Sequence, residues 1–219
     1  MKLSKEEALK KIEELLKKIE ELKAYLENGE KKETSSNVKL QIKSVYGSVL
    51  FESEKTTIKE VVEEAIIKNV NLTRANLEGA NLKGANLKGA RLRGANLKGA
   101  NLRISYLEDA DLRGADLERA DLENADLINV DLEDACLEGA NLEYAKVEDT
   151  NLIRVNLKDA KLKNVLLIDV DLEKTNLEGA DLRDANFYHV KLFGKGGQNK
   201  IKKSQVNDFL KALGIIVED

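Results

Sequence analysis

The chain has 219 residues and a nearly balanced charge, with 40 acidic residues against 36 lysines and arginines. Direct nucleic-acid binding usually requires a strong basic excess, so this balance argues against it. No apolar run reaches about 18 residues and the N-terminus turns polar at once, which argues against a membrane span or a signal peptide and predicts a cytoplasmic protein. The single cysteine, Cys136, excludes an internal disulfide and fits a reducing compartment.

Residues 1–29 are predicted to form an amphipathic helix, with Ser4 and Glu7 at capping-box spacing and Asn28-Gly29 at its end. Its apolar residues occupy three positions per heptad, a stripe wider than that of a two-stranded coiled coil, which favours a helical bundle or a homo-oligomer of three or more helices. The alternatives are a helix that folds back on its own chain and an appendage without contacts. The predicted oligomerisation residues are Leu9, Ile12, Leu15, Leu16, Ile19, Leu22 and Leu26.

The same helix has caps, charges and heptads that agree at every position, as in idealised designed helices. We interpret it as a designed segment, fused to a natural protein through a linker at residues 30–37.

Residues 38–64 are expected to form a β-hairpin that turns near Tyr46-Gly47, followed by a short helix that begins at Thr57 with Glu60 in a capping box. Hairpin and helix should cap the repeats that follow.

From residue 67 to residue 192 a large apolar residue stands at every fifth position, and all are leucine except Ile67, Val147 and Phe187. Two residues before each of them, from Ala65 to Val190, every residue is small. A period of five fits neither a helix nor a flat strand, but a chain that turns a corner every five residues points both residues inward. Eight glycines stand in the second corner position, where a type II turn needs a positive φ, and Asn or Asp before each leucine can bond to nearby backbone.

This pattern, A(N/D)LXX, as in ADLRGADLERADLENADL, resembles the pentapeptide-repeat family over residues 65–193. The resemblance implies a mainly β fold, a right-handed quadrilateral β-helix, or solenoid, with four repeats per coil. Some members of the family protect DNA gyrase by presenting an acidic rod that resembles duplex DNA. Residues 194–219 follow as a linker and a C-terminal helical cap, with Ser204 as the helix cap and Gly214 as its stop.

The sequence offers little chemistry, and we predict no enzyme, no catalytic residue, no cofactor and no metal site. The lone histidine, His189, and Cys136 both fall at outward repeat positions, where a surface role is the simpler interpretation. The segment GKGGQNK from Gly194 departs from a phosphate-binding loop at two positions. Abundant carboxylates at five-residue spacing do not supply the dense oxygen cage that calcium needs.

Two surface patterns remain. Residues 71–105 carry 7 basic residues against Glu78, whereas residues 106–135 carry 11 acidic residues against Arg113 and Arg119. We call these two segments the basic ring and the acidic ring, because each winds around the predicted rod. The acidic ring is short along the rod, which favours a solvated surface or side-by-side association of rods over DNA mimicry. With four repeats per coil, bulky apolar residues gather on one face and the corner leading into it, which indicates a contact with a protein partner or with the chain's own terminal elements. This predicted contact stripe comprises Ile104, Tyr106, Ile128, Tyr144, Leu166, Ile168 and Tyr188.

The sequence therefore predicts a non-enzymatic scaffold, a rigid rod carried on an oligomerising helix. The alternative is a protein-binding module, either of the gyrase-protecting, DNA-mimic type or one that uses the apolar stripe.

Overall fold

The computed structural model describes residue 18 and residues 39–190. The chain divides into two compact units, Met1–Val38 and Lys39–Asp219, and all elements described below belong to the second. The predicted oligomerising helix, the linker after it and the predicted C-terminal helix lie outside the described residues.

A β-hairpin opens the second unit, as the alternating pattern predicted. Strand β1 (Leu40–Lys43) pairs antiparallel with β2 (Val49–Ser53), and Ile42 lies opposite Phe51. Gly47 in the connecting turn has a φ of 85°, which residues other than glycine rarely adopt. Ile42 is buried, and it joins the hydrophobic core of the repeats.

Helix α2 (Ile58–Ile67) follows and confirms the predicted capping box. The Thr57 side chain accepts a hydrogen bond from the Glu60 backbone N–H, and the Glu60 carboxylate accepts one from the Thr57 backbone N–H at 3.2 Å. One prediction here is wrong, because Ile67, taken as the first inward residue of the repeats, is 84% exposed. The helix continues through Ile67, so helical spacing and not the five-residue period sets the direction of its side chain; the first inward leucine is Leu72.

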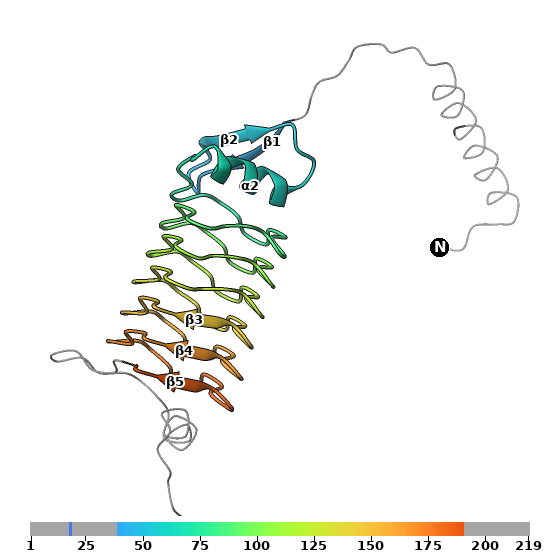
Figure 1. Cartoon of the computed structure of the whole chain (residues 1–219). Helices are drawn as coiled ribbons and strands as arrows, with labels where there is room; N and C mark the ends of the chain where they lie inside the picture. Colours follow the sequence, from blue (N-terminus) through green and yellow to red (C-terminus); the bar gives the residue numbers. More distant parts are fainter. Residues whose placement is uncertain (1–17, 19–38, 191–219) are drawn as a thin grey trace, which may run out of the picture. The chain divides into compact units, whose positions relative to one another are not determined.

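The hairpin and α2 pack on the first coil of the repeats (Figure 1). The backbone N–H of Val45 donates to the carbonyl of Arg74 at 2.8 Å, and that of Asn76 donates to the carbonyl of Lys43 at 2.7 Å. Val61 of α2 is fully buried in the same core as the leucines.

The repeats form a β-helix in which each coil takes twenty residues. Parallel bridges join residues twenty apart, as in Asn76 to Asn96 and Asn96 to Asp116, so residues 71–190 make six coils of four five-residue steps. The coils are tied by backbone hydrogen bonds such as that from Leu97 N–H to the Asp116 carbonyl at 2.7 Å. On one face the ladder is regular enough to form a parallel three-stranded sheet, β3 (Lys146–Glu148), β4 (Leu166–Ile168) and β5 (Asn186–Tyr188) (Figure 1).

The core and the corners match the sequence pattern. From Leu72 to Phe187 every fifth residue is buried, and most of the small residues two positions earlier are buried as well. All 24 second corner residues from Arg74 to His189 have a φ between 52° and 77°, although only eight of them are glycine. Most of the Asn and Asp residues before the core leucines bond to the turn as predicted; for example, the Asp116 carboxylate accepts from the Glu118 N–H at 3.0 Å.

Candidate protein-contact surface

Each coil shows four faces, and each face carries two outward residues that flank a core residue. We call the face that contains β3, β4 and β5 the β3–β5 face; its outward pairs are residues 86 and 88, 106 and 108, 126 and 128, 146 and 148, 166 and 168, and 186 and 188. Bridges from Asn86 through Tyr106 and Asp126 to Lys146 continue the sheet toward the hairpin. These residues form continuous columns along the rod.

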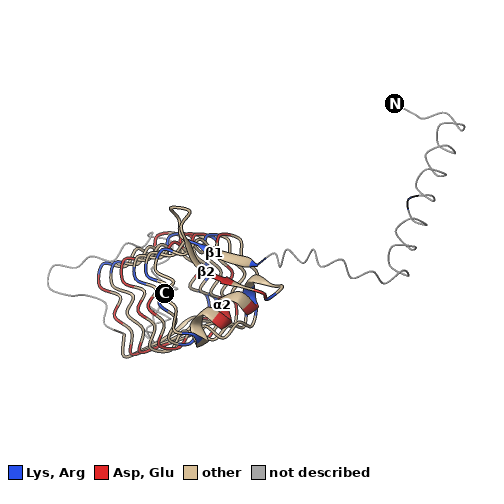
Figure 2. Cartoon of the chain, turned by 90° about the horizontal axis from the view of Figure 1, so that it is seen from above, with Lys and Arg blue, Asp and Glu red and all other residues tan. Residues whose placement is uncertain are grey.

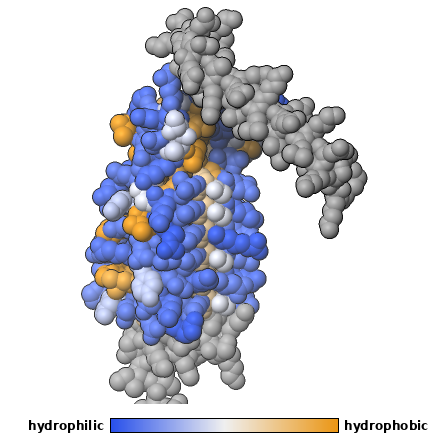
Figure 3. All heavy atoms as spheres, turned by 90° about the vertical axis from the view of Figure 1, so that its right-hand side faces the viewer, coloured by the Kyte–Doolittle hydropathy of each residue, from blue (hydrophilic) through white to orange (hydrophobic). Residues whose placement is uncertain are grey.

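The predicted contact stripe lies along this face and one of its edges. Tyr106, Ile128, Leu166, Ile168 and Tyr188 occupy outward positions of the β3–β5 face. The other two members, Ile104 and Tyr144, are second corner residues at one edge of the β3–β5 face. They form a corner column with Asn124, which lies twenty residues from each of them. In the view of Figure 3, hydrophobic patches lie along one margin of the rod among hydrophilic residues.

Four members of the stripe are well exposed: Ile104 by 47%, Tyr106 by 48%, Tyr144 by 54% and Tyr188 by 55%. The remaining three are half-buried. Large apolar side chains at these exposures, in a single strip, are typical of a contact surface.

Four of the five charged residues on the β3–β5 face form ion pairs, and the fifth, Asp126, accepts a hydrogen bond from the Ile128 backbone N–H at 3.2 Å. The Lys88 ammonium lies 5.6 Å from the centre of the Tyr106 ring and 2.6 Å from the Glu108 carboxylate. Lys146 and Glu148, which flank Val147, form an ion pair at 3.3 Å. Most charges of this face are therefore paired, which makes covering them less costly than covering isolated charges.

An open groove of about 510 Å³ lies at the end of the stripe nearest the hairpin. It is lined by the start of α2, by the corner that contains Gly84, and by Ile104, which links it to the stripe. Lys59 holds α2 against the coil, since its ammonium donates to the Gly84 carbonyl at 2.9 Å. The sequence analysis did not predict this groove, because the groove depends on where α2 lies over the corner that contains Gly84.

The backbone at the edge of the stripe is strained. Among the 24 second corner residues only Ile104 and Tyr144 are apolar, with φ values of 56° and 60°. The left-handed region costs an L-residue roughly 1–2 kcal/mol, and a β-branched residue such as Ile104 is unusual there. Both strained apolar residues fall in the same corner column, which supports a contact role for this edge.

Replacing Ile104 with glycine is expected to stabilise the rod, with the free energy of unfolding rising by about 0.5–1 kcal/mol, because glycine relieves the left-handed strain but loses chain entropy. Urea unfolding followed by circular dichroism measures the change. Asn124→Gly, one coil further along the same column, is the matched control and should change stability by at most a few tenths of a kcal/mol. A loss of stability in Ile104→Gly would show that the side chain stabilises the rod itself.

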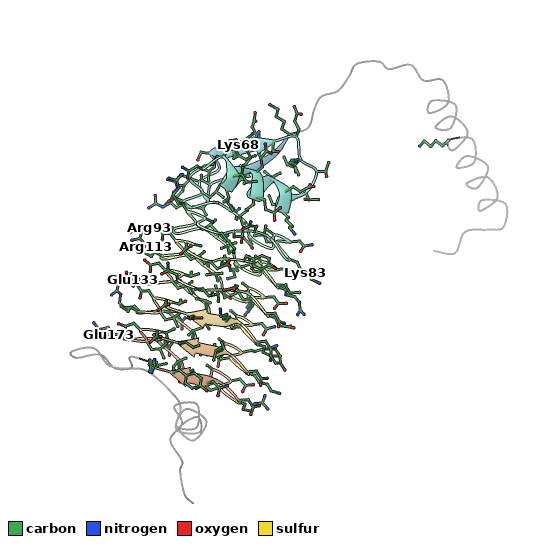
Figure 4. The ribbon with its side chains drawn as sticks, in the orientation of Figure 1. Lys68, Lys83, Arg93, Arg113, Glu133 and Glu173 are labelled. Carbon is green, nitrogen blue, oxygen red and sulfur yellow. The ribbon has the colours of Figure 1, made fainter. Side chains whose placement is uncertain are left out.

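The basic and acidic rings lie in neighbouring coils and pair with each other. Lys88 with Glu108, Lys98 with Glu118, and Arg103 with Glu123 are each separated by one coil and form ion pairs. Figure 2 shows basic and acidic residues side by side around the rod, and in Figure 4 Arg93, Arg113, Glu133 and Glu173 follow one edge. Eight of the eleven acids of residues 106–135 lie in ion pairs, so most of the acidic ring is neutralised within the rod.

Two ion pairs of the rod, Lys98 with Glu118 and Arg113 with Asp111, lower a carboxyl pKa in the folded state. The hydrogen bond from Lys98 lowers the pKa of Glu118, and that from Arg113 lowers the pKa of Asp111. A carboxyl with a lowered folded pKa stabilises the protein at pH values above its unfolded pKa, about 4, and this stabilisation is lost as the pH falls through the folded value.

Acid is therefore expected to lower the urea midpoint of the wild type below about pH 4.5. Lys98→Met, which removes the partner of Glu118, should show a smaller loss over the same range because its Glu118 pKa returns toward the unfolded value. Parallel pH profiles for the two proteins would contradict this assignment.

The two residues considered for chemistry in the sequence analysis, His189 and Cys136, are not members of the contact stripe. The His189 side chain is 82% exposed, and its Nδ1 lies 3.3 Å from the Asp169 carboxylate. Cys136 is half-buried, and the Asn156 amide nitrogen lies 3.9 Å from its sulfur. Among the described residues, no three His, Cys, Asp or Glu side chains are grouped to hold a metal ion. Within residues 39–190 no helix has the length and apolar character needed to cross a membrane.

Solved structures of other repeat proteins resemble parts of the chain. HetL from the cyanobacterium Nostoc sp. strain PCC 7120, involved in heterocyst differentiation regulation, is 33% identical over 57% of this chain and 62% of HetL, with a TM-score of 0.28. The chain thus spans less than two thirds of HetL. Rfr23 from the cyanobacterium Cyanothece 51142 is 29% identical over 58% of this chain and 84% of its own, with a TM-score of 0.35.

QnrB1, a plasmid-mediated fluoroquinolone resistance protein, is 22% identical over 66% of this chain and 85% of its own, with a TM-score of 0.30. With TM-scores this low, none of the three supports a functional argument. A search of curated proteins found no match.

The sequence profile described as "Pentapeptide repeats" matches residues 65–103, 105–143, 137–167 and 160–194, which is more than half of the chain. Proteins of this family form right-handed β-helices, in agreement with the twenty-residue coils and the left-handed corner residues described above. The chain belongs to the pentapeptide-repeat family.

Proposed function

We propose that this protein is a non-enzymatic scaffold, a rigid quadrilateral rod that binds protein through its β3–β5 face. The observation that carries the proposal is the collection of exposed apolar side chains on one side of the rod, whereas the other faces carry a single bulky apolar outward residue, Ile153, within the described coils. The groove beside α2 extends this surface, and the strained Ile104 supports its use in a contact. Binding through this face is favoured over gyrase-type DNA mimicry because the acidic ring is paired within the rod.

The proposed domain organisation assigns a separate task to each segment. Residues 1–29 act as the oligomerising helix, an idealised segment of engineered character, and residues 30–37 join it to the rod. The hairpin and α2 close the first coil, and the segment 194–219 closes the last one. Closure at both ends would prevent the exposed backbone of the end coils from pairing with other chains.

Light scattering after gel filtration tests the assembly part of this proposal. The full chain should have a molar mass that is a multiple of the monomer mass. Ile12→Gln/Ile19→Gln, which interrupts the apolar heptad positions, should lower that mass, whereas the matched control Glu13→Gln/Glu20→Gln, on neighbouring helix positions, should leave it unchanged. A monomeric full chain would contradict the assembly role.

A further inference from the structure

The β3–β5 face differs from the other three faces in the charges of its outward pairs. On this face, within the described rod, no core residue is flanked by two residues of like charge. Each of the other faces contains at least one such pair, namely Arg91/Arg93, Asp131/Glu133, Asp171/Glu173, Asp116/Glu118, Asp121/Glu123 and Lys161/Lys163. The difference in charge determines which face two rods could use to pack side by side.

Two parallel rods related by a two-fold axis along their length keep each coil at the same height but exchange left and right. The residue before a core residue in one copy then lies opposite the residue after it in the other. A face with like-charged pairs would meet repulsion in this arrangement, which disfavours three of the four faces.

On the β3–β5 face the same operation brings no like charges opposite each other; it places Glu108 opposite Tyr106 and Asp126 opposite Ile128, and the last three rows are complementary. Leu166 of one copy lies opposite Ile168 of the other, so apolar side chains meet in β4. Lys146 lies opposite Glu148 of the second copy, so each copy can supply both halves of an ion pair. Asn186 lies opposite Tyr188, and an amide beside a phenol can form a hydrogen bond.

We propose that the occupant of the β3–β5 face is a second copy of this chain, docked face to face with the rods parallel. The inference rests on the proposed function, and it identifies the protein partner of the contact surface as the chain itself. Six rows separated by about 4.8 Å give a contact about 24 Å long, and a strip one strand wide covers a few hundred Å² per copy. Stable interfaces bury about 800 Å² per partner, so this contact would be weak alone.

Association by the N-terminal helix would supply the missing affinity. Linked contacts form at a high effective concentration, so a weak rod–rod contact becomes populated once the helices have joined the chains. Parallel rods also bring both Lys39 residues, where the rods begin, to the same end, so the preceding segments can associate without a long linker.

Cysteine cross-linking in the full chain tests the arrangement. In a Cys136→Ser background, Asn186→Cys places a thiol on the β3–β5 face, and a bis-maleimide of about 10 Å matches the distance between packed sheets. The expected result is a covalent dimer, since residue 186 of each copy lies at the same height. Asn176→Cys, the corresponding asparagine on the opposite face of the same coil, is the matched control and should give at least tenfold less dimer.

Each other outcome overturns the inference in a recognisable way. An oligomer by light scattering without a cross-link at residue 186 would reject the docking surface and leave the proposed assembly intact. Equal cross-linking of both variants would reject a specific face. Cross-linking between Tyr106→Cys and Asn186→Cys in a mixture, without the 186 homodimer, would show antiparallel rods. A monomeric full chain would reject both the assembly and the docked pair.

Discussion

Replacing Leu117 with alanine should lower the free energy of unfolding by about 3–4 kcal/mol. Leu117 is fully buried in the third coil, and the small residues beside it, Ala115 and Ala120, are buried as well. The lost side chain would leave a cavity between two coils that are fixed by backbone hydrogen bonds, such as that from Leu117 N–H to the Cys136 carbonyl at 2.7 Å. Because each coil contacts only its neighbours, few other residues can move to fill the space.

Urea unfolding of the full chain measures this loss. Leu166→Ala provides the control, because it makes the same chemical change at an outward position and should cost less than about 1 kcal/mol. If both substitutions cost the same, the inward and outward assignment of the five-residue repeat would be wrong.

Replacing Thr150 with valine is expected to lower the free energy of unfolding by about 1–2 kcal/mol, although the two side chains have nearly the same shape. The Thr150 side chain is buried, and its hydroxyl donates to the Leu127 carbonyl in the preceding coil. Valine would leave that carbonyl without this donor. Valine fits the space, because Val130 and Val170 occupy the same column one coil before and one coil after.

Thermal unfolding of Thr150→Val and of the converse Val170→Thr separates packing from hydrogen bonding. Thr150→Val should lower the melting temperature even though no atom is removed from the core. A change within error would show that the hydroxyl bond adds nothing beyond the packing of the side chain.

The sequence predicted the β-helix well because one physical requirement is repeated in every coil. Leucine and a small residue must point inward at each step, and the intervening residues must turn. The prediction failed at Ile67, where the five-residue spacing continues into α2 and helical geometry decides the direction of the side chain. A local pattern cannot show which of two compatible periods the chain follows at such a junction.

The geometry of the candidate contact surface was predicted only in part. The columns of the stripe follow from four repeats per coil, so the position of Tyr106 relative to Tyr188 could be derived from their numbers. The groove beside α2 and the ion pairs between coils depend on side-chain reach and on the placement of α2, which the repeat does not determine. The strain at Ile104 requires the backbone conformation, because a corner position alone does not show how the residue is accommodated.

The most direct test of the β3–β5 face as a contact surface is tyrosine nitration of the full chain, read by mass spectrometry, at concentrations above and below association. Tyr106 and Tyr188 should become protected in the assembled protein, whereas Tyr46, which is 76% exposed on the hairpin, should react equally at both concentrations. Equal nitration of Tyr106 and Tyr188 in the assembled and dissociated protein would contradict the central claim that this face makes the contact.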